Sequence, residues 1–392
     1  PAARARMLCR VGLQYKENGR TERAEKTLSK AVSIITNRPI FGKTRTEVIR
    51  KLSDGGEHDR AYSLGRDIDS PRDRLQALLG VAKNLAKEGL QKKARKIVDK
   101  CEKALDKVTK EKRGRRRPRQ KLKTKAQLQF ELGKVHARLG NTSRAVSLFR
   151  KTLEKYTSTS ESSDKAGSGV HEYILTSDAE TKLGTKEEKV LTALATMCSF
   201  EDFSTTVNFF YRGAKRGQVY FAMALKIRKD RPDRARRMVK HAMQENAKVK
   251  NIGRRALMYA RMGRDLAEKM PEFARKTIKK ALADIAKAEI KKHIAHARSK
   301  TAEALATVGQ MDKALEVARN IDSDYYLTEA LGQVAVQMAE NGKIDQALRV
   351  LEDGPKKFHR LQFTSTIATI CAKKGMGERA LQIAGSIGRK TL

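Results

Sequence analysis

The sequence predicts an all-α protein built from repeated helical hairpins, and two observations lead to this prediction. First, the chain of 392 residues is rich in Ala, Leu, Lys and Glu, its aromatic content is only 5%, and Trp is absent. This composition suits helices and argues against a β-sandwich. Second, a unit of small residues and turn glycines returns along most of the chain. Repeats of this kind bury a core by covering one another, so the sequence predicts one continuous solenoid.

The repeated unit is clearest at residues 5–35. Gly12 and Ala24 are small residues at positions where the two helices of a hairpin must touch. Gly19 follows the first helix and predicts a tight turn there. The equivalent turn glycines of later units are Gly89, Gly140, Gly309, Gly342 and Gly375. The last three are 33 residues apart, which predicts three consecutive hairpins at the C-terminal end.

This unit resembles the tetratricopeptide repeat (TPR). That family has small residues at its eighth, twentieth and twenty-seventh positions and a turn glycine at its fifteenth, and residues 5–35 and 126–156 match it best. The C-terminal units are one residue shorter than the family's repeat of about 34 residues and lack its proline, so they are TPR-like. The resemblance covers most of the chain. It implies a right-handed superhelical solenoid of helix pairs that works as a binding scaffold.

Two distant copies of the unit also resemble each other. Residues 63–89 and 316–342 share Ile-Asp-Ser followed by Ala-Leu at a constant offset of 253 residues. Ser70 and Ser323 stand where a helix begins in each copy, and serine is a favoured N-cap residue. A register this strict indicates duplication within one solenoid.

A basic insertion interrupts the array at residues 107–125, with eleven Lys or Arg against one Glu. Charges this dense repel one another and cannot build a core, so the segment is expected to contact solvent or a polyanion. A solubilising loop and a nuclear-import signal are the alternatives. The predicted nucleic-acid-binding residues of the insertion are Lys112, Arg113, Arg115, Arg116, Arg117, Arg119, Lys121 and Lys123.

A basic ridge is predicted on the second helices of the hairpins. The repeat alanines 24, 94, 145, 235 and 274 face inward, so residues one before, two after and six after each alanine face outward. Ten of these fifteen positions are predicted to bind nucleic acid on the convex surface: Arg23, Lys26, Lys30, Lys93, Lys96, Lys100, Arg234, Arg237, Lys276 and Lys280. The other five are Arg144, Ser147, Lys151, His241 and Phe273, and none of the fifteen is acidic.

The predicted domain organisation has three parts. Residues 1–156 form N-terminal repeats, residues 157–189 form a polar linker rich in Ser, Thr and Gly, and residues 190–392 form C-terminal repeats. The start of the third part is aromatic, and its helical spacing favours core residues over a ligand-binding cluster. These aromatic residues are Phe200, Phe203, Phe209, Phe210, Tyr211, Tyr220 and Phe221.

Several kinds of chemistry are not indicated. The four cysteines form no CxxC pair, which indicates a reducing, intracellular compartment: the cytoplasm, with the nucleus or an organelle as alternatives. No cofactor, catalytic residue or metal site is predicted, and His293 and His296 are expected to be a solvated pair. No apolar run is long enough to cross a membrane. The TPR family's clamp for acidic C-terminal peptides needs Asn directly after the eighth-position residue, and here Leu13, Lys83, Lys134, Val336 and Thr369 stand there.

The net charge of +40 points to an anionic partner. Our first hypothesis is a non-enzymatic scaffold that binds RNA or another polyanion through the ridge and the insertion, as a ribonucleoprotein component. The alternative is a protein–protein adaptor that holds a peptide or an acidic partner in its concave groove or on its C-terminal repeats. Salt dependence separates the two, because release of counterions from nucleic acid makes binding fall steeply with salt.

Overall fold

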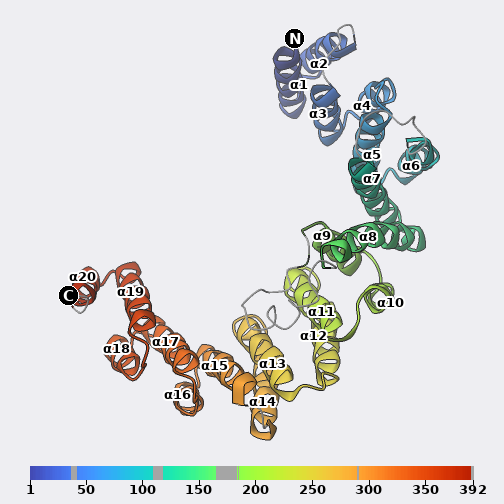
Figure 1. Cartoon of the computed structure of the whole chain (residues 1–392). Helices are drawn as coiled ribbons and strands as arrows, with labels where there is room; N and C mark the ends of the chain where they lie inside the picture. Colours follow the sequence, from blue (N-terminus) through green and yellow to red (C-terminus); the bar gives the residue numbers. More distant parts are fainter. Residues whose placement is uncertain (37–41, 109–117, 165–182, 184, 289–290, 390–392) are drawn as a thin grey trace. The chain divides into compact units, whose positions relative to one another are not determined.

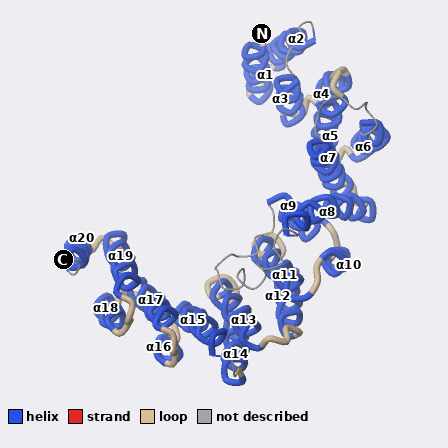
Figure 2. Tube along the Cα trace, in the orientation of Figure 1, coloured by secondary structure: helices blue, strands red, loops and turns tan. Residues whose placement is uncertain are grey.

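The structure is a computed structural model that describes residues 1–36, 42–108, 118–164, 183, 185–288 and 291–389 (Figure 1). All regular elements in these ranges are helices, as Figure 2 shows, which confirms the predicted all-α fold. The described residues fall into two compact units, Pro1–Phe210 and Tyr211–Leu392.

The first unit holds α1 to α10. These helices are α1 (Ala2–Glu17), α2 (Thr21–Thr36), α3 (Gly42–Asp54), α4 (His58–Arg66), α5 (Pro71–Lys87), α6 (Gln91–Val108), α7 (Pro118–Arg138), α8 (Thr142–Asp164), α9 (Thr185–Met197) and α10 (Phe200–Phe210).

The second unit holds α11 to α20. These helices are α11 (Gly213–Ile227), α12 (Pro232–Ala247), α13 (Ile252–Leu266), α14 (Pro271–Lys287), α15 (Lys291–Thr307), α16 (Met311–Arg319), α17 (Asp324–Glu340), α18 (Ile344–Glu352), α19 (Lys357–Lys373) and α20 (Gly377–Arg389).

The helices pack as hairpins, each odd-numbered helix against the even-numbered helix that follows it. The odd-numbered helices also pack on one another, α1 to α7 in the first unit and α13 to α19 in the second. We call these the first-helix layer of each unit, and the even-numbered helices the second helices. In Figure 1, α6 lies to one side of α5 and α7, and α16 and α18 lie to one side of α15, α17 and α19. Each unit is therefore a solenoid of helical hairpins.

The hairpin turns follow the predicted glycines. Gly19 has φ 73°, a left-handed conformation that glycine adopts without a steric penalty. The Arg20 amide then donates to the Tyr15 carbonyl at 2.8 Å, which satisfies one of the last carbonyls of α1. The other predicted turn glycines also have positive φ: Gly89, Gly140, Gly309, Gly342 and Gly375. The helix ends were thus correctly predicted from these residues.

Helix α5 shows how the sequence sets a helix start. Ser70 is its N-cap, and the Ser70 Oγ accepts a hydrogen bond from the Asp73 amide at 3.3 Å. Pro71 occupies the first turn, where no backbone N–H is needed. Ser323 is the N-cap of α17 as predicted, although its side chain makes no capping bond.

The inward face of the hairpins is also as predicted. The repeat alanines 24, 94, 145, 235 and 274 are at most 3% exposed. A Cβ atom on Gly12 would lie 2.7 Å from Leu28 of the partner helix, closer than real Cβ contacts allow. Small residues therefore set how closely the two helices of a hairpin approach.

Two buried positions differ from prediction. Phe273 was expected on the outward face but is 4% exposed, because its large apolar ring gains more from the hairpin interior than from water. His296 was expected to be solvated but is buried, with its ring stacked on Tyr326 at 4.9 Å between centroids. The side chain of His293 lies outside the described residues, so the proposed pairing is not seen.

Helices extend into both segments that were predicted to interrupt the array. Helix α6 continues to Val108, and α7 begins at Pro118, so the ends of the predicted insertion 107–125 are helical; residues 109–117 lie outside the described ranges. Helix α8 continues to Asp164 and α9 begins at Thr185, so both enter the predicted linker 157–189. The boundary between the compact units comes later, after Phe210. The three-part division from sequence stays a prediction.

Among the described helices, none has the length and apolar character that a membrane crossing requires. The four cysteines are buried, and none of them forms a disulfide. The intracellular compartment stays a prediction.

Candidate functional site

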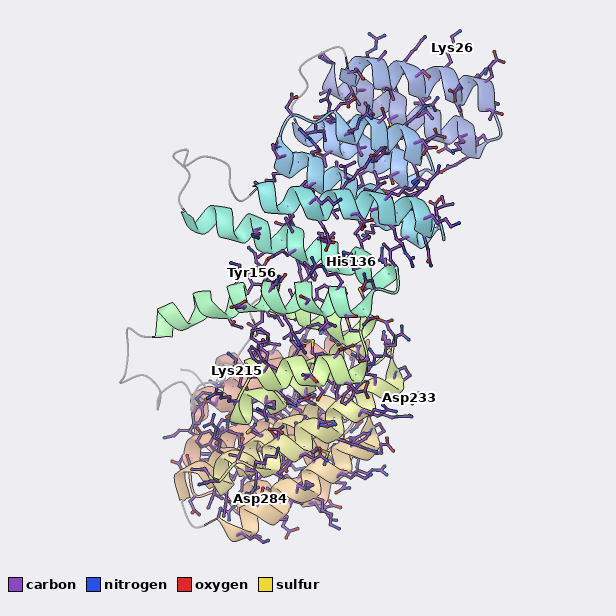
Figure 3. The ribbon with its side chains drawn as sticks, turned by 90° about the vertical axis from the view of Figure 1, so that its right-hand side faces the viewer. Lys26, His136, Tyr156, Lys215, Asp233 and Asp284 are labelled. Carbon is purple, nitrogen blue, oxygen red and sulfur yellow. The ribbon has the colours of Figure 1, made fainter. Side chains whose placement is uncertain are left out.

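Most of the basic ridge is exposed, as its outward position predicts. Lys26 points away from the ribbon at the edge of the first unit (Figure 3). The other exposed ridge cations are Arg23, Lys30, Lys93, Lys96, Lys100, Arg144, Lys151, Arg237, Lys276 and Lys280, whereas Arg234, Ser147 and His241 are half-buried. Exposure shows that these residues can be reached. Their binding role stays a prediction.

The insertion residues cannot be placed in the same way. Lys112, Arg113, Arg115, Arg116 and Arg117 lie outside the described residues. Arg119, Lys121 and Lys123 belong to α7, but the description does not extend to their side chains. Their proposed contacts with nucleic acid stay a prediction.

Several ridge cations pair with the neighbouring second helix. Lys93 of α6 lies 3.1 Å from Asp59 of α4, and Arg144 of α8 donates to Glu102 of α6 at 2.7 Å. Lys100 Nζ donates to the Tyr62 hydroxyl at 2.8 Å. Asp59 and Glu102 belong to the preceding hairpin and stand outside the fifteen outward positions, so those positions alone overstated the positive charge of the ridge. Each exposed ion pair contributes about 1 kcal/mol or less, and the two carboxylates offset part of the positive charge that the ridge offers to a polyanion.

Glu102 also faces a buried histidine. His136 Nε2 lies 3.2 Å from Glu102 Oε1 without forming a well-directed hydrogen bond. Burial lowers the pKa of His136 below its ordinary value, while the Glu102 charge opposes that shift. His136 is therefore neutral at pH 7 and acts in packing between hairpins.

A hollow of about 180 Å³ lies between α5 and α7, two neighbouring helices of the first-helix layer. We call it the α5–α7 hollow. Its apolar lining comes from Leu79 and Leu128, which are buried, whereas Arg72, Gln76 and Gln127 are exposed. The remaining lining residues are Gly80, Lys83 and Glu131. Ligand-binding sites usually combine an apolar floor with a small number of polar groups at the rim, as this hollow does.

Gly80 is the distinctive residue of this hollow. It lies inside α5, where glycine costs about 0.5–1 kcal/mol relative to alanine. A Cβ added at Gly80 would meet no atom within 4 Å, unlike one at Gly12 or Gly133. Helix packing therefore does not require glycine here. Its missing side chain leaves room for another backbone to approach the helix closely.

The rim of the hollow can recognise a peptide. Gln76 and Gln127 each offer a donor and an acceptor, which match the N–H and C=O groups of an extended backbone. Arg72 and Lys83 supply cations for acidic side chains. Glu131, the acid of the lining, lies 3.0 Å from Lys134, which offsets its charge. The sequence analysis did not identify the residues that line the α5–α7 hollow. Gly80, a glycine inside a strongly helical stretch, was the signal that could have indicated them.

An ion cluster holds the first-helix layer of the second unit together. Lys300 of α15 lies 3.2 Å from Glu303 of the same helix and 2.8 Å from Glu329 of α17. Arg264 of α13 reaches Glu303 at 3.5 Å. The cluster therefore links three successive first helices.

Three hydrogen-bonded side chains, Ser53, His58 and Glu88, have the residue types of a hydrolase triad. Ser53 Oγ lies 3.3 Å from His58 Nδ1, and His58 Nε2 lies 2.6 Å from Glu88 Oε2. Ser53 is fully buried, so no substrate carbonyl can reach its hydroxyl. Asn84 also donates a hydrogen bond to Ser53 at 3.1 Å. These side chains therefore link α3, α4 and α5 structurally. Among the described residues, no group of three or more His, Cys, Asp or Glu could hold a metal ion.

Comparison with known proteins gives one family match. The model of the tetratricopeptide repeat matches residues 5–37, the first hairpin of the chain. A search of curated proteins found no match.

Solved structures give weaker resemblances. Ton1535 from Thermococcus onnurineus NA1 is 12% identical, covering 93% of this chain and 99% of its own, with a TM-score of 0.32. A circular tandem repeat protein is 12% identical, with 98% and 89% covered and a TM-score of 0.35. The Cut9–Hcn1 heterotetramer of the APC/C is 13% identical, with 99% and 80% covered and a TM-score of 0.24. TM-scores this low carry no argument, so the repeat assignment rests on the first hairpin and on the chain's own architecture.

Proposed function

We propose that this chain, a TPR-like α-solenoid, is a protein-interaction scaffold that binds an acidic, extended peptide segment of a partner in the α5–α7 hollow. One observation carries the proposal: among the described residues no atom lies within 4 Å of a Cβ added at Gly80, which leaves the helix surface open inside a hollow with an apolar floor and a polar rim. This is the adaptor alternative from the sequence, now attached to particular residues.

The preference for an acidic partner follows from charge. Arg72 and Lys83 line the hollow, and the whole chain has a net charge of +40. A positive surface steers acidic partners toward the binding site and raises their association rate. Leu79 and Leu128 would cover one apolar side chain of the peptide, while Gln76 and Gln127 bond its backbone.

The RNA-binding hypothesis has less support. It rests on basic residues alone, and Lys93 and Arg144 of the ridge pair with acids of the neighbouring hairpin. The peptide proposal rests on a shaped hollow as well as on charge. We therefore prefer the adaptor function and treat RNA binding as an outcome that the experiment must separate from it.

A displayed library of random 12-residue peptides, selected on the full chain, tests the proposal. We expect an acidic consensus that binds the unchanged chain and the control Gly385→Leu, but not Gly80→Leu. Gly385 is also a helical glycine with no atom within 4 Å of an added Cβ, and it lies in α20 of the other unit. Equal selection on Gly80→Leu would contradict the site. Failure to select any peptide, together with tight RNA binding that weakens steeply with salt, would favour the polyanion hypothesis.

A further inference from the structure

The two cations of the α5–α7 hollow form a line with its apolar floor. Arg72 and Lys83 stand eleven residues apart on α5, just over three turns, so both side chains leave the same face of the helix. At 1.5 Å per residue they are separated by about 16 Å along the helix axis. Leu79 lies between them and forms the buried floor together with Leu128 of α7. The hollow therefore presents a cation, an apolar floor and a second cation in one line.

Both cations of the hollow are available to a ligand. Among the described residues, Arg72 and Lys83 form no ion pair. Arg74 of the same helix, by contrast, donates to a backbone carbonyl at 2.7 Å. Arg72 is exposed and Lys83 is half-buried, so a bound segment can reach both. Glu131, the acid of the lining, has its own cation in Lys134 at 3.0 Å, which leaves the charge of Arg72 and Lys83 for the ligand.

The internal duplication indicates that the repeat fold does not require these residues. Residues 63–89 match residues 316–342 at an offset of 253. By this offset, Arg72, Gly80 and Lys83 correspond to Tyr325, Gln333 and Val336 of α17. Helix α17 packs on α18 as α5 packs on α6, although it has an aromatic, an amide and an apolar residue at the three positions. The two cations and the glycine are therefore a property of this hollow, which points to a ligand.

An extended segment matches this line through alternate residues. Helices α5 and α7 pack side by side (Figure 1), and the lining extends over three turns of α5, so a segment in the hollow runs along the helices. Successive side chains of an extended chain point to opposite faces, and each residue advances about 3.3 Å. The first, third and fifth residues of such a segment therefore face the hollow over about 13 Å. The flexible side chains of Arg72 and Lys83 close the difference of about 3 Å.

We propose that the α5–α7 hollow selects segments in which two acidic residues flank one apolar residue at alternate positions, acid–x–apolar–x–acid, where x is any residue; this inference rests on the proposed function. One carboxylate pairs with Arg72 and the other with Lys83. The apolar side chain between them fills the hollow of about 180 Å³ above Leu79 and Leu128. The spacing of charges, and not only their number, then decides which acidic partner binds.

Two synthetic peptides test the spacing on the full chain by titration calorimetry. The parent peptide has glutamate at its third and seventh positions, leucine at its fifth, and Ser or Gly at the other positions. Its isomer has the same composition, but the glutamates occupy the fourth and sixth positions and point away from the hollow when the leucine is bound. We expect the parent to bind the unchanged chain and Gly385→Leu alike, and the isomer to bind both about tenfold more weakly.

Charge exchange identifies the partner of each carboxylate. Arg72→Glu and Lys83→Glu should each weaken binding of the parent peptide about fivefold or more, because each replaces an attraction with a repulsion. Lysine in place of one glutamate of the peptide should restore binding to Arg72→Glu, and lysine in place of the other should restore binding to Lys83→Glu. Lys103→Glu is the matched control: Lys103 is exposed on α6, outside the hollow, so this variant should bind the parent normally.

Equal binding of the parent and the isomer to the unchanged chain, or no binding of the parent, would overturn the spacing proposal. So would charge exchange that leaves either variant unrestored at an unchanged melting temperature. If Gly80→Leu still abolishes binding of a library-selected acidic peptide in these cases, the peptide site stands and only the spacing is wrong. Equal binding of the parent to Gly80→Leu and to the unchanged chain would contradict both proposals. The comparison of parent and isomer uses the unchanged chain, so it decides the question even where a charge-reversed variant folds poorly.

Discussion

Removal of the Lys300 ammonium is predicted to destabilise the second unit strongly. The Lys300 side chain is 6% exposed, and its partners Glu303 and Glu329 are 14% and 19% exposed. Lys300→Ala leaves two mostly buried carboxylates without their shared cation. Breaking a buried ion pair lowers the free energy of unfolding by about 3–5 kcal/mol. Because Arg264 still pairs with Glu303, we expect a loss near the lower end, about 3 kcal/mol.

The assay is urea unfolding followed by circular dichroism. A loss of about 3 kcal/mol should lower the urea midpoint of the affected unit by about 1 M or more. Lys134→Ala is the matched control, because its pair with Glu131 is more exposed and should contribute about 1 kcal/mol or less. The double change Lys300→Met with Glu329→Met should recover most of the stability, since it removes both charges of the bridge between α15 and α17. If Lys300→Ala is no less stable than Lys134→Ala, the cluster does not hold the layer together.

Three further predictions concern buried residues. Ala347→Phe should lower the free energy of unfolding by about 1–3 kcal/mol, because Ala347 of α18 is fully buried where α18 packs on α17. An unchanged melting temperature would mean that the inward face is misassigned. Burial raises the pKa of Cys9 to about 11 and that of Cys101 to about 12, so neither thiol should react with a disulfide reagent at pH 8 until the protein unfolds, and fast labelling in the native state would refute this. The pKa of His136 is lowered in the folded state, so its contribution to stability is complete above about pH 6.5 and is lost as the pH falls. His136→Gln should flatten that part of the pH dependence of the urea midpoint.

Residue spacing predicted the hairpins because a repeat fold depends on contacts that are close in sequence. Gly19 and Gly342 end helices through their own backbone conformation, and Ala24 meets its partner within one hairpin. Such features can be found from one unit alone. The same reasoning failed for Phe273, since a position on a helical wheel does not show which neighbouring helix covers a large ring.

The candidate sites depend on contacts between hairpins, which the sequence does not show directly. Lys93 meets an acid 34 residues earlier, so a ridge judged within one unit appeared more basic than it is. Phe209 was predicted to be a core residue but is 76% exposed, because it stands six residues after the fully buried Phe203 and so lies about 120° away from it around α10. The role of Gly80 likewise follows from the space beside it, although its place inside a helix was visible in the sequence.

The most direct test of the account is the affinity of a selected acidic peptide for three forms of the full chain, measured by titration calorimetry. Gly80→Leu should bind at least tenfold more weakly than the unchanged chain, because its side chain occupies the α5–α7 hollow. Its melting temperature should be equal or higher, since an added Cβ at Gly80 meets no atom within 4 Å and leucine favours a helix more than glycine does. Gly385→Leu should bind normally. Equal affinity of the peptide for all three forms would contradict the proposed scaffold site.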